Sequence, residues 1–271
     1  MKKTKKRNRF FAYIKDSFKE LINSFKKLNI QLLFVIVMDL LFFVLSYAVF
    51  FVLAKILANQ ALKLQGFSMD FIELEQTQAA MRSFQNFLYI FLVFFILLVV
   101  FMLFNWSFFK YSIWNLVIKG KILLKGFWTF VLANLVWFLI WLVPFIFTIY
   151  PFFVMAKAQL QLQSPPLFPI VIFFILLVAL IHFTYLYFIG FIKEHKISKA
   201  IAFAFRTGTV KIRYLLLPYF FILVGLFILS LITYPLNFIS NKISLAISLV
   251  VLLAYVGWIR FYISKIVLAI K

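Results

Sequence analysis

Residues 30–57 read IQLLFVIVMDLLFFVLSYAVFFVLAKIL, an apolar run interrupted by only a few polar residues. A helix of about 20 apolar residues crosses the hydrocarbon core of a bilayer, and this run is longer. It follows the segment 14–27, IKDSFKELINSFKK, in which apolar residues recur at helical spacing among basic ones. No turn signal separates the two stretches. The sequence therefore predicts a basic surface helix that leads directly into a membrane-spanning helix.

Six apolar runs in the chain are long enough to span a membrane as helices. Strands of a membrane β-barrel would be shorter and would alternate between polar and apolar residues, which these runs do not. We therefore predict an all-α polytopic membrane protein with six transmembrane helices. The predicted spans are Ile30–Leu57, Phe87–Phe109, Phe127–Met155, Leu167–Ile192, Tyr214–Ile239 and Ile243–Ile270.

The composition leads to the same class of protein. Of the 271 residues, 66% are hydrophobic, and the mean hydropathy is +1.09, whereas soluble domains are about 45–50% apolar. The net charge of +21 lies between the apolar runs, so anionic lipid headgroups are the expected partner and nucleic acid is not. The chain has no cysteine, which excludes disulfides and thiolate metal sites.

The distribution of Lys and Arg predicts the orientation of the chain in the membrane. Most of the basic residues lie before the first span, in the second and fourth connections and near the C-terminal end. The other connections hold Lys55, Lys63, Arg82, Lys157 and Lys242. Because basic loops stay in the cytoplasm, we expect a multi-pass protein of the cell membrane with both termini cytoplasmic.

Three basic amphipathic helices are expected on the cytoplasmic side, near 11–28, 111–124 and 196–211. Residues 1–9 are too charged to fold alone and are expected to form a disordered basic arm, and 10–271 form a single six-helix domain. The amphipathic helices are predicted to lie in the inner interface with their cations on lipid headgroups. The predicted headgroup contacts are Lys19, Lys26, Lys119, Lys121, Lys199, Arg206 and Lys211.

Similarity between these basic segments favours three repeats of a surface helix followed by two spans. Aligning Lys26, Lys119 and Arg206 places apolar residues in matching columns. The alternative is that any protein with an even number of spans carries basic amphipathic connections on one side. The sequence leaves both explanations open.

Asp39 and His182 are the most informative polar residues inside the predicted spans. Each lies about 13–15 Å from the inner end of its span at 1.5 Å per residue, so their predicted depths match. Charged groups at such depth are costly and face the bundle interior. An Asp39–His182 pair would serve either as a proton relay or as a polar clasp between helices. Asn105 and Asn134 are further candidates, expected as interhelical hydrogen bonds more than as ligands.

Signatures of catalysis are missing from the sequence. There is no H-E-x-x-H, no G-x-S-x-G and no phosphate-cradling glycine loop. The two histidines are far apart, so no metal site is expected, and His195 needs no special role among the loop charges. We expect no enzyme activity and no cofactor.

Two functional hypotheses follow. The first is a non-enzymatic, membrane-embedded binding or scaffold protein that acts through contacts with lipid or protein, including a second copy of the chain. The alternative is a small transporter or permease with a buried polar site formed by Asp39 and His182. A scaffold predicts a dry, Phe-packed interior, whereas a transporter predicts that these two residues line a water-accessible cavity.

Overall fold

The structure, a computed structural model, describes residues 15, 17–24, 30–64, 74–161, 167–235 and 241–270. These residues form helices and connecting turns, and none of them is in a β-strand. Residues 17–24 are helical. The elements that follow are α2 (Ile30–Leu64), α3 (Leu74–Lys119), α4 (Phe127–Gln161), α5 (Leu167–Glu194), α6 (Ile197–Phe205), η1 (Arg206–Val210), η2 (Ile212–Tyr214), α7 (Leu216–Thr233) and α8 (Asn241–Ala269).

Six of these helices, α2, α3, α4, α5, α7 and α8, contain stretches long and apolar enough to cross a membrane. The stretches are Ile30–Leu62, Met81–Lys119, Phe127–Thr148, Ile170–Glu194, Leu216–Thr233 and Ile243–Ala269. Each overlaps one predicted span, so the prediction of an all-α polytopic fold with six membrane-spanning helices is confirmed. The chain is a multi-pass integral membrane protein.

Several helix boundaries differ from the predicted ones. Both α2 and α4 run past their predicted ends, to Leu64 and Gln161. The 46 residues of α3 make it about 70 Å long at 1.5 Å per residue, more than twice the hydrocarbon thickness. Residues 111–119 continue this helix without a break, and 120–126 form a loop, so the segment near 111–124 is not a separate helix. In contrast, α7 ends at Thr233, short of the predicted Ile239. A 3₁₀ turn at Tyr234 and Pro235 follows it.

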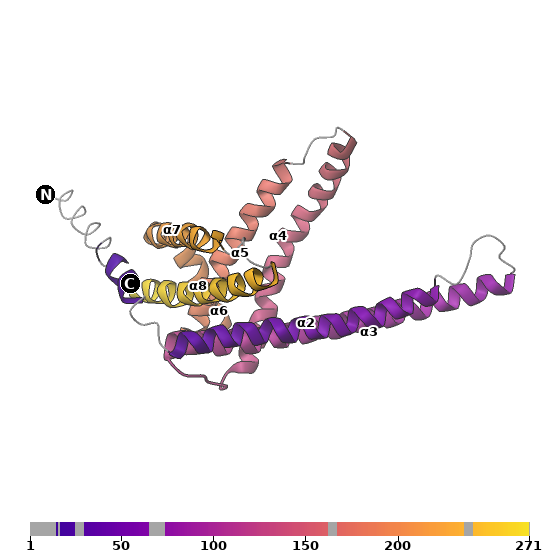
Figure 1. Ribbon diagram of the computed structural model, residues 1–271, viewed down its shortest axis with the longest axis horizontal. Coiled ribbons are helices and arrows are strands. Elements are labelled where there is room, and N and C mark those ends of the chain that lie inside the picture. Colours follow the sequence, from indigo (N-terminus) through magenta and orange to yellow (C-terminus); the bar gives the residue numbers. More distant parts are fainter. Residues whose placement is uncertain are drawn as a thin grey trace. The chain divides into compact units, whose positions relative to one another are not determined.

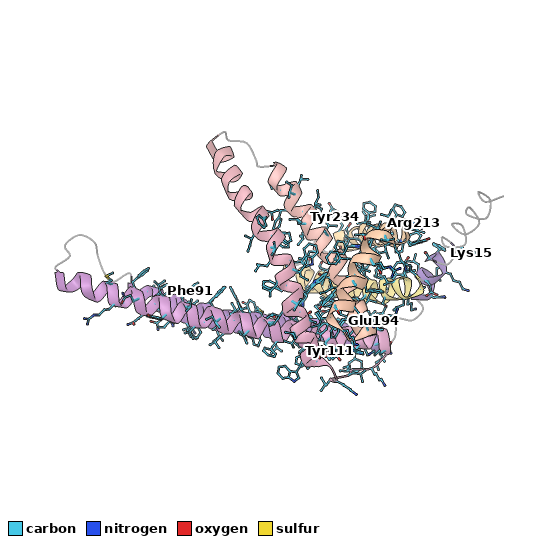
Figure 2. All side chains as sticks on the ribbon, turned by 180° about the vertical axis from the view of Figure 1, so that it is seen from behind. Lys15, Phe91, Tyr111, Glu194, Arg213 and Tyr234 are labelled. Carbon is cyan, nitrogen blue, oxygen red and sulfur yellow. The ribbon has the colours of Figure 1, made fainter. Side chains whose placement is uncertain are left out.

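The chain divides into two compact units. The hairpin unit comprises Met38–Phe109, and the main unit comprises Met1–Val37 together with Lys110–Lys271. In the hairpin unit, apolar side chains stand exposed along α3, around Phe91 for example (Figure 2). Since apolar surface of this extent is unfavourable in water, lipid is its expected solvent.

The core of the main unit lies at one end of its helices. Along α4, Phe130, Ala133, Trp137 and Trp141 are buried at the spacing of one helix face. On α5, the first half exposes side chains such as Phe174, whereas 186–192 are buried on all sides. Most of 257–267 in α8 is buried as well. The packed region therefore takes in only part of each helix, and the remaining apolar halves are left for lipid.

The α5–α6 pair forms a tight antiparallel hairpin within this core. Figure 1 shows α4 and α5 as neighbours, with α6 beside α5. A Cβ on Gly190 of α5 would lie 2.8 Å from the Phe203 ring of α6, so the glycine permits the close approach of the two helices. Further along, Phe183 packs on Phe205 with 5.0 Å between ring centroids. The predicted surface segment 196–211 thus forms α6 and η1 and follows α5 back along its length.

Other parts of the predicted domain organisation fall on residues outside the described part of the chain. The arm 1–9 lies outside the described residues, as does much of the segment 11–28. The three aligned basic segments take different forms in the part of the chain that the structure describes, since 111–119 end a long helix and 197–205 are a short separate one. The threefold repeat stays a prediction.

Candidate functional site

His182 lies in the middle of a polar network inside the main unit. Its Nδ1 is 2.6 Å from the hydroxyl of Tyr219 on α7, and its Nε2 is 3.3 Å from the carbonyl oxygen of Gly208 in η1. A carbonyl can only accept, so Nε2 carries the hydrogen and donates it to Gly208. The Tyr219 hydroxyl, which can donate or accept, is the partner of Nδ1, so the imidazole has a partner at each nitrogen. It joins α5, η1 and α7 at one point.

The backbone around Gly208 is shaped to reach His182. Residues 206–210 form a π-helical turn directly after α6, and such turns widen the helix by one residue. A Cβ on Gly208 would lie 2.5 Å from Phe183 Cε1 and 2.8 Å from His182 Nε2. Any side chain here would push η1 away from α5. Glycine is therefore what allows the backbone carbonyl to approach the imidazole.

Two further hydrogen bonds hold α4 against α5 next to this network. The Trp137 indole donates to the Thr184 hydroxyl at 2.9 Å, and the Tyr187 hydroxyl donates to the Ala133 carbonyl at 2.7 Å. The Trp137 and Tyr187 rings stack with 4.3 Å between centroids and 4° between planes. The polar atoms of these aromatic side chains are satisfied within the chain, and the rings fill the space between the helices.

The hairpin unit holds two of the predicted site residues. Asn105 on α3 donates to the Ser46 hydroxyl on α2 at 2.8 Å, an interhelical hydrogen bond of the kind expected from the sequence. Asp39 is buried, with 1% of its surface exposed. Asp39 belongs to the hairpin unit and His182 to the main unit, and their pairing stays a prediction.

The other predicted site residues lie partly in the connections and partly in the spans. Asn134 is buried on α4. Of the predicted headgroup contacts, Lys211 is half-buried and Lys26 lies outside the described residues. The exposed ones are Lys19, Lys119, Lys121, Lys199 and Arg206.

A second polar cluster, which the sequence did not indicate, forms where two connections meet. Lys119 at the end of α3 and His195 after α5 approach to 2.7 Å between Nζ and Nε2. Since an ammonium can only donate, the imidazole accepts and is neutral. Burial of the ring, and then the nearby charge of Lys119, hold the pKa of His195 below its ordinary value. Nearby, the Tyr111 hydroxyl donates to the carbonyl oxygen of Lys125.

The N-terminal helical residues dock on α8. The buried Trp258 indole donates to the Ser24 hydroxyl at 2.8 Å, and Lys265 lies 3.8 Å from the Glu20 carboxylate. Ser17 is buried on this side, whereas Phe18 and Ile22 remain exposed. The segment thus has one face on protein and an apolar face that is open to lipid.

Comparison with known proteins identified no relative whose function could guide the interpretation of these sites. No protein-family model, curated protein or solved structure matches the chain. Within the described residues, no three His, Asp or Glu side chains gather in a way that could hold a metal ion. The candidate site therefore rests on geometry alone, in the His182 network and in the Lys119–His195 cluster.

Proposed function

We propose that this integral membrane protein is a non-enzymatic scaffold that acts through contacts with lipid headgroups or with protein. In this proposal it resides in the cell membrane with both termini cytoplasmic, and its exposed cations bind anionic headgroups. It needs no cofactor. Nucleic acid is not a partner, and a second copy of the chain or another membrane protein can be one.

The main support for the proposal is that the His182 network leaves neither ring nitrogen open to a ligand. Both ring nitrogens have partners within the chain, Tyr219 and Gly208. A histidine that served as a substrate ligand or proton relay would need a nitrogen open to a ligand or to water. In this geometry the ring instead acts as a clasp that holds three elements together.

The placement of the cations supports the same proposal. Five of the predicted headgroup contacts are exposed to solvent, on residues 17–24, at the end of α3, in the loop after it and on α6–η1. Each Lys or Arg near an anionic surface contributes about 1 kcal/mol of attraction. A scaffold that binds lipid headgroups needs cations exposed on its surface, and these five residues provide them.

A small transporter remains the second candidate because of three other buried groups. Within the described part of the chain, Ser112 Oγ, Asn115 Oδ1 and Trp141 Nε1 are buried without a hydrogen-bond partner. Such groups are rare in folded proteins and are commonly satisfied by water. An aqueous path that reached them would satisfy all three.

The proposal is tested by measuring which lipids stabilise the protein. The full chain, in micelles of an uncharged detergent, is heated with added phosphatidylglycerol or, as the matched uncharged lipid, phosphatidylcholine of the same acyl chains. A ligand that binds the folded state raises the melting temperature. We expect a larger rise with phosphatidylglycerol, and a smaller one in high salt. Equal shifts with both lipids would contradict binding of anionic headgroups.

A further inference from the structure

Two connections that are far apart in sequence form one basic surface at the end of the main unit. Residues 120–126 join α3 to α4, and His195 and Lys196 join α5 to α6. They meet through the 2.7 Å contact between Lys119 Nζ and His195 Nε2, 76 residues apart. Figure 2 shows Tyr111 and Glu194 at this same end of the unit. We call this surface the Lys119–His195 cluster.

The backbone holds the cluster in a defined shape. Gly120 and Gly126, at the two ends of the loop, have positive φ angles of 70° and 89°. The loop is tied to α3 by the hydrogen bond from Tyr111 to the Lys125 carbonyl. A Cβ on Gly126 would lie 3.1 Å from the Tyr111 hydroxyl and 3.9 Å from His195 Nδ1. The loop therefore lies close against both Tyr111 and His195.

His195 stands where glycine would be the ordinary residue. It follows the last residue of α5, its amide donates to the Phe191 carbonyl at 2.8 Å, and its φ is 53°. This left-handed conformation after a helix strongly favours glycine. Strained residues of this kind concentrate at functional sites. Because glycine would form this turn more easily, the presence of histidine indicates that the imidazole side chain has a role of its own.

The charges around the cluster are almost all of one sign. Glu194 is the acidic residue among the charged residues of the two connections, and the Lys199 Nζ lies 3.9 Å from its carboxylate. Like charges that lie near one another repel, and an anion bound among them removes that repulsion. The cations of the two connections and of the adjoining helix ends are Lys119, Lys121, Lys125, Lys193, Lys196 and Lys199.

Exposed apolar side chains on the same loop identify the source of the anion. Ile122 and Leu124 stand between Lys121 and Lys125, with exposed fractions of 45% and 64%, and Trp128 follows at 72%. A free phosphate ion has no acyl chain and would make no favourable contact with these apolar side chains. At the boundary between headgroups and acyl chains, both the lysines and the apolar side chains find favourable partners. The combination fits a phospholipid.

We propose that the Lys119–His195 cluster binds the phosphate of one anionic phospholipid headgroup. Lys119 and His195 contact the phosphate oxygens, and Ile122, Leu124 and Trp128 contact the start of the acyl chains. The proposal rests on the proposed function, because it names the lipid class and the site for a scaffold that binds lipid headgroups.

The test counts lipids bound to the full chain by native mass spectrometry in detergent micelles. The probe is dioleoyl phosphatidylglycerol, with dioleoyl phosphatidylcholine as the uncharged comparison. The variants are Lys119→Gln and His195→Asn, since asparagine tolerates the left-handed backbone. Lys55→Gln is the matched control, because it removes one exposed basic charge from α2, in the hairpin unit and outside the predicted headgroup contacts. Melting temperatures in phosphatidylcholine alone verify that each variant is folded.

We expect one phosphatidylglycerol to bind more tightly than the rest. Lys119→Gln should weaken that first binding step about fivefold, His195→Asn should weaken it as well, and Lys55→Gln should leave it unchanged. An equal effect of Lys119→Gln and Lys55→Gln would overturn the site while leaving a general preference for anionic lipid intact. No preference for phosphatidylglycerol in the unmodified protein would overturn both proposals.

A competition arm separates a lipid from a free anion. Inorganic phosphate is added at millimolar concentration to protein that carries one phosphatidylglycerol. We expect the lipid to remain bound, because the apolar contacts of Leu124 and Trp128 are made only by a lipid. Displacement of the lipid by phosphate, together with unchanged binding in Leu124→Ser, would overturn the assignment to a phospholipid.

Discussion

Tyr219 and His182 lie 37 positions apart in sequence, and the tyrosine hydroxyl is 2.6 Å from the imidazole Nδ1. The contact links α7 to α5, and the opposite nitrogen of the ring binds the Gly208 carbonyl of η1. The imidazole therefore serves as a junction for three elements that adjacency in sequence does not bring together. Its geometry leads to the first two predictions.

Tyr219→Phe should destabilise the main unit by about 1 kcal/mol. The change removes the hydroxyl that is hydrogen-bonded to His182 Nδ1 and leaves that nitrogen without a partner. The measurement is the melting temperature of the purified protein in a fixed detergent. Tyr89→Phe is the control, since Tyr89 is exposed on α3, and it should cause no change. Equal melting temperatures for all three proteins would show that the hydrogen bond contributes nothing.

Gly208→Ala should destabilise the protein by about 1–3 kcal/mol through overpacking. The added methyl would meet Phe183 Cε1 at 2.5 Å and His182 Nε2 at 2.8 Å. Phe183→Leu would free part of that space, so the double variant should recover part of the loss. The measurement is a double-mutant cycle of unfolding free energies. Additive effects of the two substitutions would contradict the close packing of η1 on α5.

Trp258→Phe should loosen the N-terminal residues 17–24 from α8. The substitution keeps an aromatic ring at position 258 but removes the indole N–H that binds the Ser24 hydroxyl at 2.8 Å. We expect faster amide hydrogen exchange in 17–24, and unchanged exchange in α4 and α5. Trp128→Phe, at an exposed position, should leave the exchange of 17–24 as it is. Uniformly faster exchange throughout the chain would instead indicate general destabilisation.

Acidification should destabilise the protein through His195. Its pKa in the fold lies below the ordinary value of 6.5, so the unfolded chain binds the proton more readily than the folded chain does. The contribution to stability is complete above pH 6.5 and is lost as the pH falls towards the lowered pKa. The charged residues of α3, the loop, α5 and α6 around His195 are Lys119, Lys121, Lys125, Lys193, Glu194, Lys196 and Lys199.

The pH prediction is checked with melting temperatures between pH 5 and pH 8 in phosphatidylcholine micelles. His195→Asn should show a flatter profile than the unmodified protein below pH 6.5. Bound phosphatidylglycerol should also flatten the profile, because a phosphate stabilises the protonated ring. A profile that His195→Asn leaves unchanged would assign the acid sensitivity to other groups.

The membrane-spanning helices could be predicted from sequence because their signal is local. Twenty or more apolar residues in a row determine a span whatever they pack against, and all six predicted runs correspond to such helices. The end of α3 was harder to place. Residues 111–119 carry a helical apolar pattern and end in a lysine, Lys119, which suits both a surface helix and the continuation of a span. The packing of Tyr111 and Trp114 into the core favours the continuation.

The polar contacts could be predicted only in part. The depth of His182 marked it as an interior residue, but its partners Tyr219 and Gly208 depend on the register between α5, η1 and α7, which no sequence period encodes. The positive-inside pattern placed Lys119 and His195 on the same side of the membrane. It could not bring them to 2.7 Å, because that contact depends on the turn after α5 and on the loop that Tyr111 holds.

A scaffold of the kind proposed has a polar interior that is closed to water and binds its partners at its outer surface. The water accessibility of buried polar positions in this cysteine-free chain tests this point. Asp39→Cys reports on the hairpin unit and Asn134→Cys on the main unit, with Ser198→Cys on the exposed start of α6 as the positive control. Each variant is treated in vesicles with a membrane-impermeant thiol reagent from either side. We expect labelling at position 198 alone, whereas labelling at 39 or 134 in folded protein would reveal an aqueous path and overturn the proposal of a closed interior.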